Sequence, residues 1–256
     1  ALETSGCAAA RTGWVPRHLA LYRREGGAAR LVAAAPAYAH ADSDGDFAQD
    51  WGYAEGAARA RIPYYPKLVL GVPFTPATGR RLLVAPGEDR AACSRALLEG
   101  ALRLAEEERL GSVQVLFADP EERAPLEAAG LMLRVSYQFH FRNEGYGDLG
   151  EFLARFDSKR RNQLRREMAA PARQGIAIRT VRGDELAADA PGFARTAHAL
   201  HRSTIDKLAW GRGWLSLAFY ERVLPRMAHR IEIVEARREG RIVAGASVVA
   251  VVLVAG

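Results

Sequence analysis

Apolar positions in this chain recur with two different periods, and segments of the two kinds alternate along the sequence. Some short segments are apolar at every second residue, which is typical of strands, and longer ones every three to four residues, which is typical of helices. The strongest helical pattern covers residues 88–109, where Cys93, Leu97, Ala101 and Leu104 form one stripe. Strands separated by helices in this way favour a mixed α/β fold.

Turn residues mark where these segments end. A Glu-Gly-Gly turn at residues 25–27 joins the first two strands, and Gly130 is expected to end a helix in the left-handed conformation. Residues 131–142 are expected to form a long strand with its aromatic residues on one face. The expected strands are 17–24, 30–38, 67–72, 81–85, 113–117, 131–142, 176–181, 231–236 and a return strand from 242; the expected helices are 47–61, 88–109, 120–129, 149–156, 158–173, 191–207 and 217–228.

A short sequence repeat suggests that this pattern occurs twice. The sequence Arg-Arg-Glu-Gly stands at residues 23–26 and again at residues 237–240, each time between a strand and an apolar return strand. We therefore expect two copies of one α/β module, at residues 1–143 and 148–256. Only sixteen residues follow the second repeat, so the second module is expected to be cut short.

The charge balance is mildly basic. The chain of 256 residues has 36 Lys and Arg against 30 Asp and Glu, a formal net charge of +6. This excess favours an anionic partner such as a phosphate, a nucleic acid or an acidic cell-wall precursor. The same Arg-rich, Ala-rich composition is also what a GC-rich genome produces.

No targeting or metal-binding pattern is recognisable. Cys7 and Cys93 lack metal-type spacing, so both are expected to be reduced thiols, and no metal is expected. The chain starts without Met, so an N-terminal part is expected to be missing, and it shows no signal peptide. The longest apolar run, residues 242–255, is shorter than the roughly 20 residues that a membrane helix needs. These features predict a cytoplasmic protein without a membrane span.

Residues 84–132 resemble the central segment of the GNAT acyltransferases. The sequence ALLEGALRLAEEERLGSVQVLFADPEERAPLEAAGLM carries the likeness. GNAT enzymes bind the pyrophosphate of coenzyme A with a glycine-rich loop before the long helix, through backbone amides and the helix N-terminus. Here residues 87–93 lack those glycines and carry Glu88 and Asp89 instead. The first module is therefore not expected to bind acyl-CoA.

Six segments spread along the chain carry a second likeness: RTGWVPRHL, Pro-Ala-Tyr at 36–38, YYPKLVLGVPFTPATGRRLL, SYQFHFRNEGY, EFLARFDSKRRNQLRRE and HRSTIDKLAWG. Through them nearly the whole chain resembles the FemAB-like proteins of peptidoglycan biosynthesis or recognition, which are double-GNAT relatives of the Fem-type peptidyltransferases. The resemblance implies two GNAT-like modules, each a mixed central sheet flanked by helices. The chain departs from the family pattern at residues 39–41, where Ala-His-Ala follows Tyr38 in place of a polar or charged segment. The family's further N-terminal helix and the closing half of its second module are also absent.

Fem-type chemistry, as the resemblance implies, transfers an amino acid from an aminoacyl-tRNA to the amine of a peptidoglycan precursor. An acceptor cleft is expected around the Tyr-Tyr-Pro-Lys segment, where Lys67 would meet a phosphate or carboxylate and the tyrosines would stack on sugar or peptide. The alternative is a rigid start of a strand with Lys67 exposed. The candidate acceptor residues are Tyr38, Asp46, Tyr64, Tyr65, Lys67, Phe74, Thr75, His140 and Asn143.

Two carboxylates have a second interpretation. Asp46 and Asp50 are spaced as an i, i+4 pair that would position an attacking amine, or they only cap and solvate the start of a helix. His140 is expected near the junction of the modules, facing a cleft, although a lone His there is more often structural.

The second module offers a basic helix and a candidate catalytic pair. Basic side chains on one broad arc of the helix at residues 158–173 would contact successive phosphates of a tRNA, or only solvent. Asp206 would orient the amine and Lys207 the carbonyl; adjacent residues on a helix face different directions, so at most one of them is expected to be catalytic. The candidate anion-binding residues are Lys159, Arg160, Arg161, Arg165 and Arg166.

Three functions remain open from the sequence. The first is an acyl or aminoacyl transferase acting on a cell-wall precursor, with acyl-CoA or aminoacyl-tRNA as donor. The second is a non-catalytic module that binds peptidoglycan fragments or RNA. The third is an acetyl-CoA-dependent enzyme acting on a small amine. The oligomeric state stays open.

Overall fold

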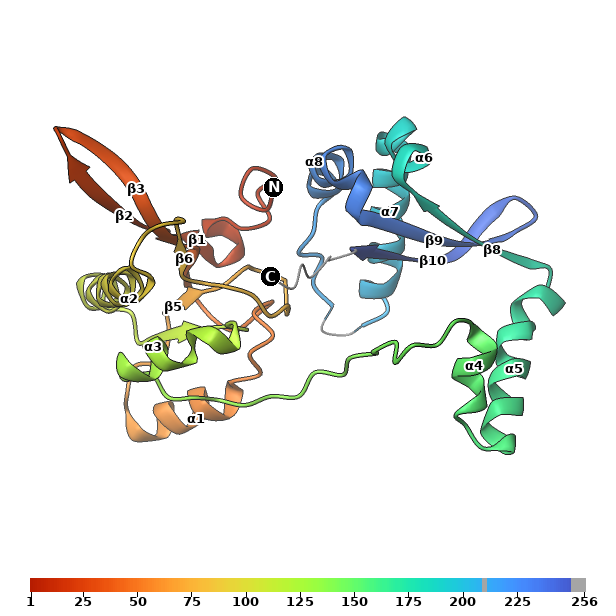
Figure 1. Cartoon of the computed structure of the whole chain (residues 1–256), viewed down its shortest axis with the longest axis horizontal. Helices are drawn as coiled ribbons and strands as arrows, with labels where there is room; N and C mark the ends of the chain where they lie inside the picture. Colours follow the sequence, from red (N-terminus) through yellow and green to blue (C-terminus); the bar gives the residue numbers. More distant parts are fainter. Residues whose placement is uncertain (209–210, 250–256) are drawn as a thin grey trace. The chain divides into compact units, whose positions relative to one another are not determined.

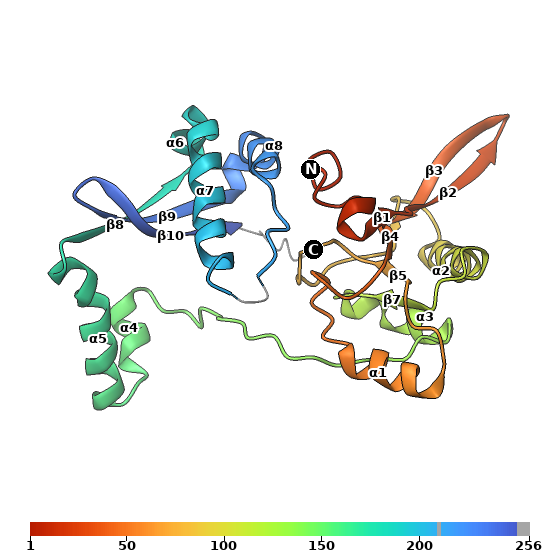
Figure 2. The ribbon, with the colours of Figure 1, turned by 180° about the vertical axis from the view of Figure 1, so that it is seen from behind.

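The computed structural model describes residues 1–208 and 211–249 and divides into two compact units, residues 1–135 and 136–256. Figures 1 and 2 show the elements of each unit. The fold class is α/β, with mixed and antiparallel sheets flanked by helices, as the sequence predicts.

The first unit is built on a four-stranded sheet in the order β1-β4-β5-β7. The strand β4 (Ala37–His40) pairs antiparallel with β1 (Trp14–Pro16) and β5 (Lys67–Leu70), and β5 pairs parallel with β7 (Ser112–Val115). A second sheet has the order β2-β3-β6. The hairpin of β2 and β3 extends away from the rest of the unit (Figure 1). The bounds of the second sheet are β2 Leu19–Glu25, β3 Ala28–Ala35 and β6 Leu83–Val84.

One face of the four-stranded sheet packs on the long helix α2 (Arg90–Glu107). Leu68 and Leu70 of β5 point to this side and form one core with Leu97 and Leu98 of the helix. The apolar stripe predicted from the sequence is thus the buried face of α2. The remaining helices of the unit are η1 Ala10–Thr12, α1 Trp51–Ala60, η2 Pro120–Glu122 and α3 Arg123–Ala128.

The second unit has a three-stranded antiparallel sheet in the order β10-β9-β8. Helices α6, α7 and α8 pack around it, with Leu186, Ala194, Leu224 and Ile233 in the core. Helices α4 and α5 lie side by side (Figures 1 and 2). The bounds are α4 Leu149–Ala154, α5 Ser158–Arg173, β8 Ile176–Arg182, α6 Gly183–Ala188, α7 Ala190–Ile205, α8 Leu217–Met227, η3 Ala228–Arg230, β9 Ile231–Arg238 and β10 Arg241–Val249.

The predicted strand at residues 131–142 is wrong. This segment has no strand assignment, and its apolar side chains lie in solvent, with Tyr137 93% and Phe139 100% exposed. The alternation predicts how the side chains divide between two faces, but a strand also needs a hydrogen-bonded neighbour. None lies beside this segment in the part of the chain that the structure describes.

The two Arg-Arg-Glu-Gly sequences both lie at hairpins, but at positions that differ by one residue. The first hairpin turns at Gly26 and Gly27, and the second at Glu239 and Gly240; all four residues have positive φ. Glu25 therefore ends a strand, whereas Glu239 is part of the turn. The repeat therefore marks two hairpins with similar turns. Aligning the two Arg-Arg-Glu-Gly sequences, however, pairs residues that occupy different positions in their hairpins.

Candidate functional site

The Lys67 side chain lies on the face of the four-stranded sheet opposite the α2 core. Successive residues of a strand point to opposite faces, so Lys67 and Val69 share one face while Leu68 and Leu70 take the other. Lys67 is paired in register with His40 of β4. The Gln114 side chain, from β7, reaches the same group.

Two carboxylates and a hydroxyl surround the Lys67 ammonium. The Nζ atom donates to Asp46 Oδ2 at 2.6 Å, to Asp50 Oδ2 at 2.7 Å and to Ser43 Oγ at 2.7 Å. Gln114 Oε1 lies 3.3 Å away. The Lys67 side chain is 0% exposed. An ammonium has three N–H donors, so protein groups occupy all of them.

Asp50 accepts more hydrogen bonds than any other residue of this group. Its Oδ1 accepts from Ser43 Oγ at 2.5 Å, and its Oδ2 accepts from the Tyr64 hydroxyl at 2.7 Å and from Gln114 Nε2 at 2.9 Å, besides Lys67. The Tyr65 hydroxyl lies 2.6 Å from Ser43 Oγ. We call these seven residues the Lys67 cluster: Ser43, Asp46, Asp50, Tyr64, Tyr65, Lys67 and Gln114.

The pKa values follow from this arrangement. Burial by itself would raise the pKa of Asp50, but the hydrogen bonds it accepts, first among them that from Lys67, outweigh burial and hold this pKa well below its usual range. Burial, and then the adjacent Asp50 carboxylate, raise the pKa of Tyr64 well above its usual range. Asp50 is therefore ionised and Tyr64 protonated at neutral pH.

The cluster carries an excess of negative charge. One ammonium faces two carboxylates, so its formal charge is −1, and all three side chains are almost completely buried. Tyr64, Tyr65 and Gln114 are half-buried and form its solvent side. Such a site attracts a cation and offers it hydroxyl and amide groups.

An aromatic wall continues along the same face of the sheet. His40 stacks on Trp14 with ring centroids 3.8 Å apart, and its Nδ1 lies 2.8 Å from the carbonyl oxygen of Gly13. Burial lowers the pKa of His40, although the Gly13 carbonyl and the nearby Asp42 and Asp46 carboxylates oppose this. The neutral ring with its proton on Nδ1 fits the Gly13 contact.

Comparison with known families gives a match over residues 1–251 to the FemAB-like family, described as peptidoglycan biosynthesis/recognition. The chain belongs to the FemAB-like family. Its members are transferases, and the family relates this chain to peptidoglycan biosynthesis. No curated protein matches the chain.

The resemblance seen in the sequence is thus confirmed for this FemAB-like chain. The described residues contain no helix that is long and apolar enough to cross a membrane. Within the same residues, no group of three or more His, Cys, Asp or Glu side chains is arranged to hold a metal ion.

The structure corrects the interpretation of Lys67 and its carboxylates. Lys67 is neither exposed nor open to a substrate phosphate, because its own chain supplies all the acceptors. Asp46 and Asp50 are not a helical pair, since α1 begins at Trp51, and the side chain of Asp50 makes no capping hydrogen bond. Both contact Lys67, which no i, i+4 argument predicts.

Sequence reasoning missed Ser43 and Gln114. Ser43 lies in the acidic segment at residues 42–46, and Gln114 is a polar residue inside a short apolar strand. A polar residue at a buried strand position is a signal for an internal hydrogen-bond network, because burial without a partner is costly. The sequence shows this signal at Gln114, and it shows none that singles out Ser43.

The other predicted acceptor residues of the first unit are Tyr38, Phe74 and Thr75, and none of them belongs to the Lys67 cluster. Tyr38 and Phe74 pack edge-on against Trp14, with ring centroids 5.8 and 5.7 Å away. The Tyr38 hydroxyl donates to Glu3 at 2.9 Å. Burial, and then Glu3, raise the pKa of this hydroxyl. Thr75 is exposed and donates to the carbonyl oxygen of Pro73.

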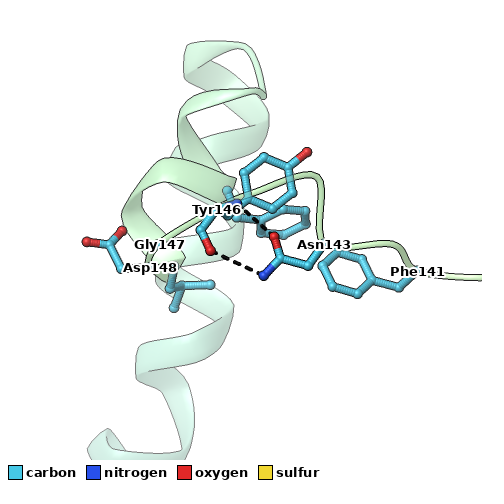
Figure 3. A pocket seen from close by; sticks show the side chains of 7 residues that line it. Phe141, Asn143, Tyr146, Gly147 and Asp148 are labelled. Carbon is cyan, nitrogen blue, oxygen red and sulfur yellow. Dashed lines mark hydrogen bonds between the residues drawn. The ribbon is translucent and has the colours of Figure 1, made fainter. Parts of the chain in front are cut away.

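His140 and Asn143 belong to the second unit. His140 is exposed. Asn143 accepts hydrogen bonds from the backbone of Gly145 and Tyr146 and lines a shallow pocket of about 410 Å³ with Phe141 (Figure 3). Asp148, another polar residue of that pocket, accepts from the backbone N–H of Glu151 at the start of α4. His140 and Asn143 are therefore in a different unit from the Lys67 cluster, and their part in acceptor binding stays a prediction.

The predicted basic helix forms with the expected bounds. None of the residues of α5, all of which the structure describes, is buried. Arg161 is half-buried and the other four candidate cations are exposed. None of the five pairs with a carboxylate among the described residues. The cations are Lys159, Arg160, Arg161, Arg165 and Arg166.

The candidate catalytic pair lies at the end of α7. Asp206 is exposed and pairs with Arg202, one turn earlier, at 2.5 Å. Lys207 is exposed in the following turn. Residues 209–210 of the same sequence segment lie outside the described residues.

The start of α2, where a GNAT enzyme binds pyrophosphate, is occupied by side chains of the chain itself. Asp89 accepts from the backbone N–H of Ala92 at 3.0 Å. The buried Glu88 carboxylate pairs with Arg23 at 2.5 Å and with Arg30. A helix N-terminus binds an anion through its unpaired N–H groups, and here an internal carboxylate already uses one of them.

Proposed function

We propose that this FemAB-like chain is an N-acyltransferase that passes an aminoacyl or acyl group to an amine of a peptidoglycan precursor, and that the solvent side of the Lys67 cluster binds this amine. The supporting observation is the buried formal charge of −1 behind three half-buried polar side chains. An acceptor amine arrives as an ammonium, which this charge attracts.

The cluster is suited to holding and orienting the amine. The bound ammonium first loses one proton to solvent, which frees the nitrogen lone pair. The transfer then forms a bond between the amine nitrogen and the acyl carbon and breaks the bond to the leaving alcohol or thiol, which takes up the second proton that the nitrogen loses. The Tyr64 hydroxyl donates its proton to Asp50 at 2.7 Å and accepts a hydrogen bond from Gln114 Nε2 at 2.8 Å. One lone pair of this half-buried oxygen is left as an acceptor for the amine N–H. Fixed acceptors of this kind hold the nucleophile in an attacking orientation.

Tyr64→Phe is expected to lower kcat/KM for the acceptor about tenfold or more, because it removes a hydrogen bond to a charged group. The measurement is amine acylation, followed by mass spectrometry, with a UDP-linked muropeptide as acceptor and aminoacyl-tRNA or acetyl-CoA as donor. Tyr22→Phe, which removes the same hydroxyl from an exposed position of β2, is the matched control. Equal rates for Tyr64→Phe and Tyr22→Phe would refute the amine site.

Two observations favour aminoacyl-tRNA over acyl-CoA as donor. The basic side chains of α5 lack carboxylate partners among the described residues, and Asp89 uses a backbone donor at the start of α2. An aminoacyl-tRNA donor would place the reaction in the cytoplasm. Asp206 and Lys207 stay predictions for the donor side.

Changing Arg160, Arg165 and Arg166 together to Gln is expected to weaken tRNA binding and to reduce the slope of log affinity against log salt by about 2–3, because each phosphate contact contributes just under one to that slope. Filter binding at several salt concentrations measures it. Arg24, Arg95 and Arg103, which are exposed in the first unit, changed together to Gln give the control of equal net charge. Equal slopes for both triple variants would exclude α5 as the tRNA surface.

A second candidate function is a module that binds muropeptides without acting on them. It is favoured by the saturation of Lys67, whose hydrogen bonds all go to its own chain. Muropeptide binding by calorimetry with no acylation from either donor would select this candidate.

A further inference from the structure

Arg81 is a buried cation at the opposite end of β5 from Lys67. It follows the loop that leaves β5, and this loop meets the turn that leaves the parallel strand β7 at a bridge between Gly79 and Ala118. In α/β sheets, ligands bind outside the carboxyl ends of parallel strands. Arg81 is 5% exposed at such an end.

Backbone carbonyl groups fix the Arg81 guanidinium in one orientation. Its Nε donates to the carbonyl oxygen of Leu116 at 2.8 Å, and its Nη2 donates to that of Ala77 at 2.6 Å. No hydrogen bond joins Nη1 to any acceptor among the described residues, although this nitrogen carries two N–H donors. The guanidinium is thus held rigidly, with one nitrogen left over.

The nearest carboxylate is used elsewhere. Glu122 accepts from the backbone N–H of Arg81 at 2.9 Å and from that of Leu82 at 2.7 Å. The Glu122 carboxylate is near enough to interact with the guanidinium by charge, but no ion pair joins the two side chains in the described part of the chain. Burial lowers the pKa of Arg81, and Glu122 opposes this; an arginine keeps its charge near neutral pH in any case.

The other carboxylates of this region are also engaged. Glu121 pairs with the exposed Arg80 at 2.7 Å. Asp119 accepts from the backbone at the start of η2. Neither leaves a carboxylate to neutralise Arg81.

Gly79 leaves room in front of the free nitrogen. A Cβ atom at this position would lie 3.3 Å from Arg81 Nη1. Its φ is outside the left-handed region, so an alanine fits the backbone here and differs mainly in the space it takes.

We propose that Arg81 anchors an anion-binding subsite at this end of the sheet, which takes a carboxylate or phosphate group of a ligand through Nη1. Guanidinium groups bind both kinds of oxyanion by charge-assisted hydrogen bonds. The subsite is separate from the Lys67 cluster and does not depend on the proposed transfer reaction.

The test is calorimetric titration of the 256-residue chain with two probes, inorganic phosphate and N-acetylglycine, which distinguish a phosphate from a carboxylate ligand. Arg81→Met is expected to weaken binding of the preferred probe at least tenfold. Gly79→Ala, which keeps the Arg81 side chain but brings a methyl group to about 3.3 Å from Nη1, is expected to weaken it several-fold. Arg80→Met removes the same charge one residue away and is expected to bind as the parent chain does.

Three results would overturn the proposal. They are no binding of either probe to the parent chain, unchanged binding in Gly79→Ala, and equal weakening by Arg80→Met and Arg81→Met. Gly79→Ala decides the matter even if Arg81→Met fails to fold. Because these readouts are binding of small anions, their failure leaves the Tyr64 acylation test untouched.

Discussion

Replacing Lys67 with Met is expected to lower the free energy of unfolding of the first unit by about 3–5 kcal/mol, the usual cost of removing one partner of a buried ion pair. Methionine fills most of the volume of the lysine stem but donates no hydrogen bond. Asp46 and Asp50 would then face each other in a site where their side chains are 0% and 2% exposed. The loss comes mainly from these unpaired carboxylates.

Amide hydrogen exchange in β4 and β5 measures this effect in the first unit alone, which matters in a chain of two units. Arg59→Met is the matched control, because Arg59 pairs with Glu55 on the exposed face of α1 and such pairs contribute about 0–1 kcal/mol. Adding Asp46→Asn and Asp50→Asn to Lys67→Met is expected to restore part of the protection, since amides carry no charge. If Lys67→Met and Arg59→Met exchange alike, the cluster does not hold the unit together.

The elements that local sequence predicts well are those whose pattern is complete within one segment. The bounds expected for α5 agree with the structure, and the stripe from Cys93 to Ala101 is the buried face of α2. Capping and periodicity depend on residues three or four apart, so the sequence contains them directly. The strand prediction for residues 131–142 failed because a strand needs a neighbouring strand to pair with, and local sequence does not show whether one is present.

The Lys67 cluster depends on contacts between distant residues. Asp50 lies 17 residues before Lys67, and Gln114 lies 47 residues after it. The sequence identified Lys67 and Tyr64 as candidates through the family resemblance, and Asp46 and Asp50 through their i, i+4 spacing, but not as members of one network. The pairing of β5 with β7 brings Lys67 and Gln114 together, and the segments after β4 and before β5 carry the other members. Neither the register nor the path of these segments is readable from one strand at a time.

In the proposed acceptor site the amine binds at the edge of this network and not at Lys67 itself. The ammonium is saturated, so its role is to keep two carboxylates together in a buried place. The half-buried Tyr64 and Gln114 then present that charge to solvent. In the proposed acceptor site Lys67 would be a positioning residue, so its loss is expected to affect stability and acceptor binding together.

The stability of the first unit is expected to fall steeply below about pH 4, and Asp50→Asn is expected to remove part of that fall. The folded state holds the pKa of Asp50 well below its usual range, whereas the unfolded chain has an aspartate pKa of about 3.9. Above that value both states are ionised and the full contribution is present. As the pH falls below about 3.9, Asp50 is protonated in the unfolded chain but stays ionised in the folded one. The free energy of unfolding therefore drops by up to about 1.4 kcal/mol per pH unit.

Denaturation by urea at pH 7, 5, 4 and 3, read by exchange of β4 and β5 amides, tests this. His40 is held neutral by burial, against an unfolded pKa of about 6.5, so its own loss of stability starts at higher pH and is common to both proteins. Asp50→Asn is expected to have a lower free energy of unfolding than the parent at pH 7, and this difference is expected to narrow between pH 5 and 3. Glu55→Gln, the same chemical change on exposed α1, should keep the parent's pH profile. A constant difference between Asp50→Asn and the parent down to pH 3 would mean that the ionised Asp50 does not stabilise the fold.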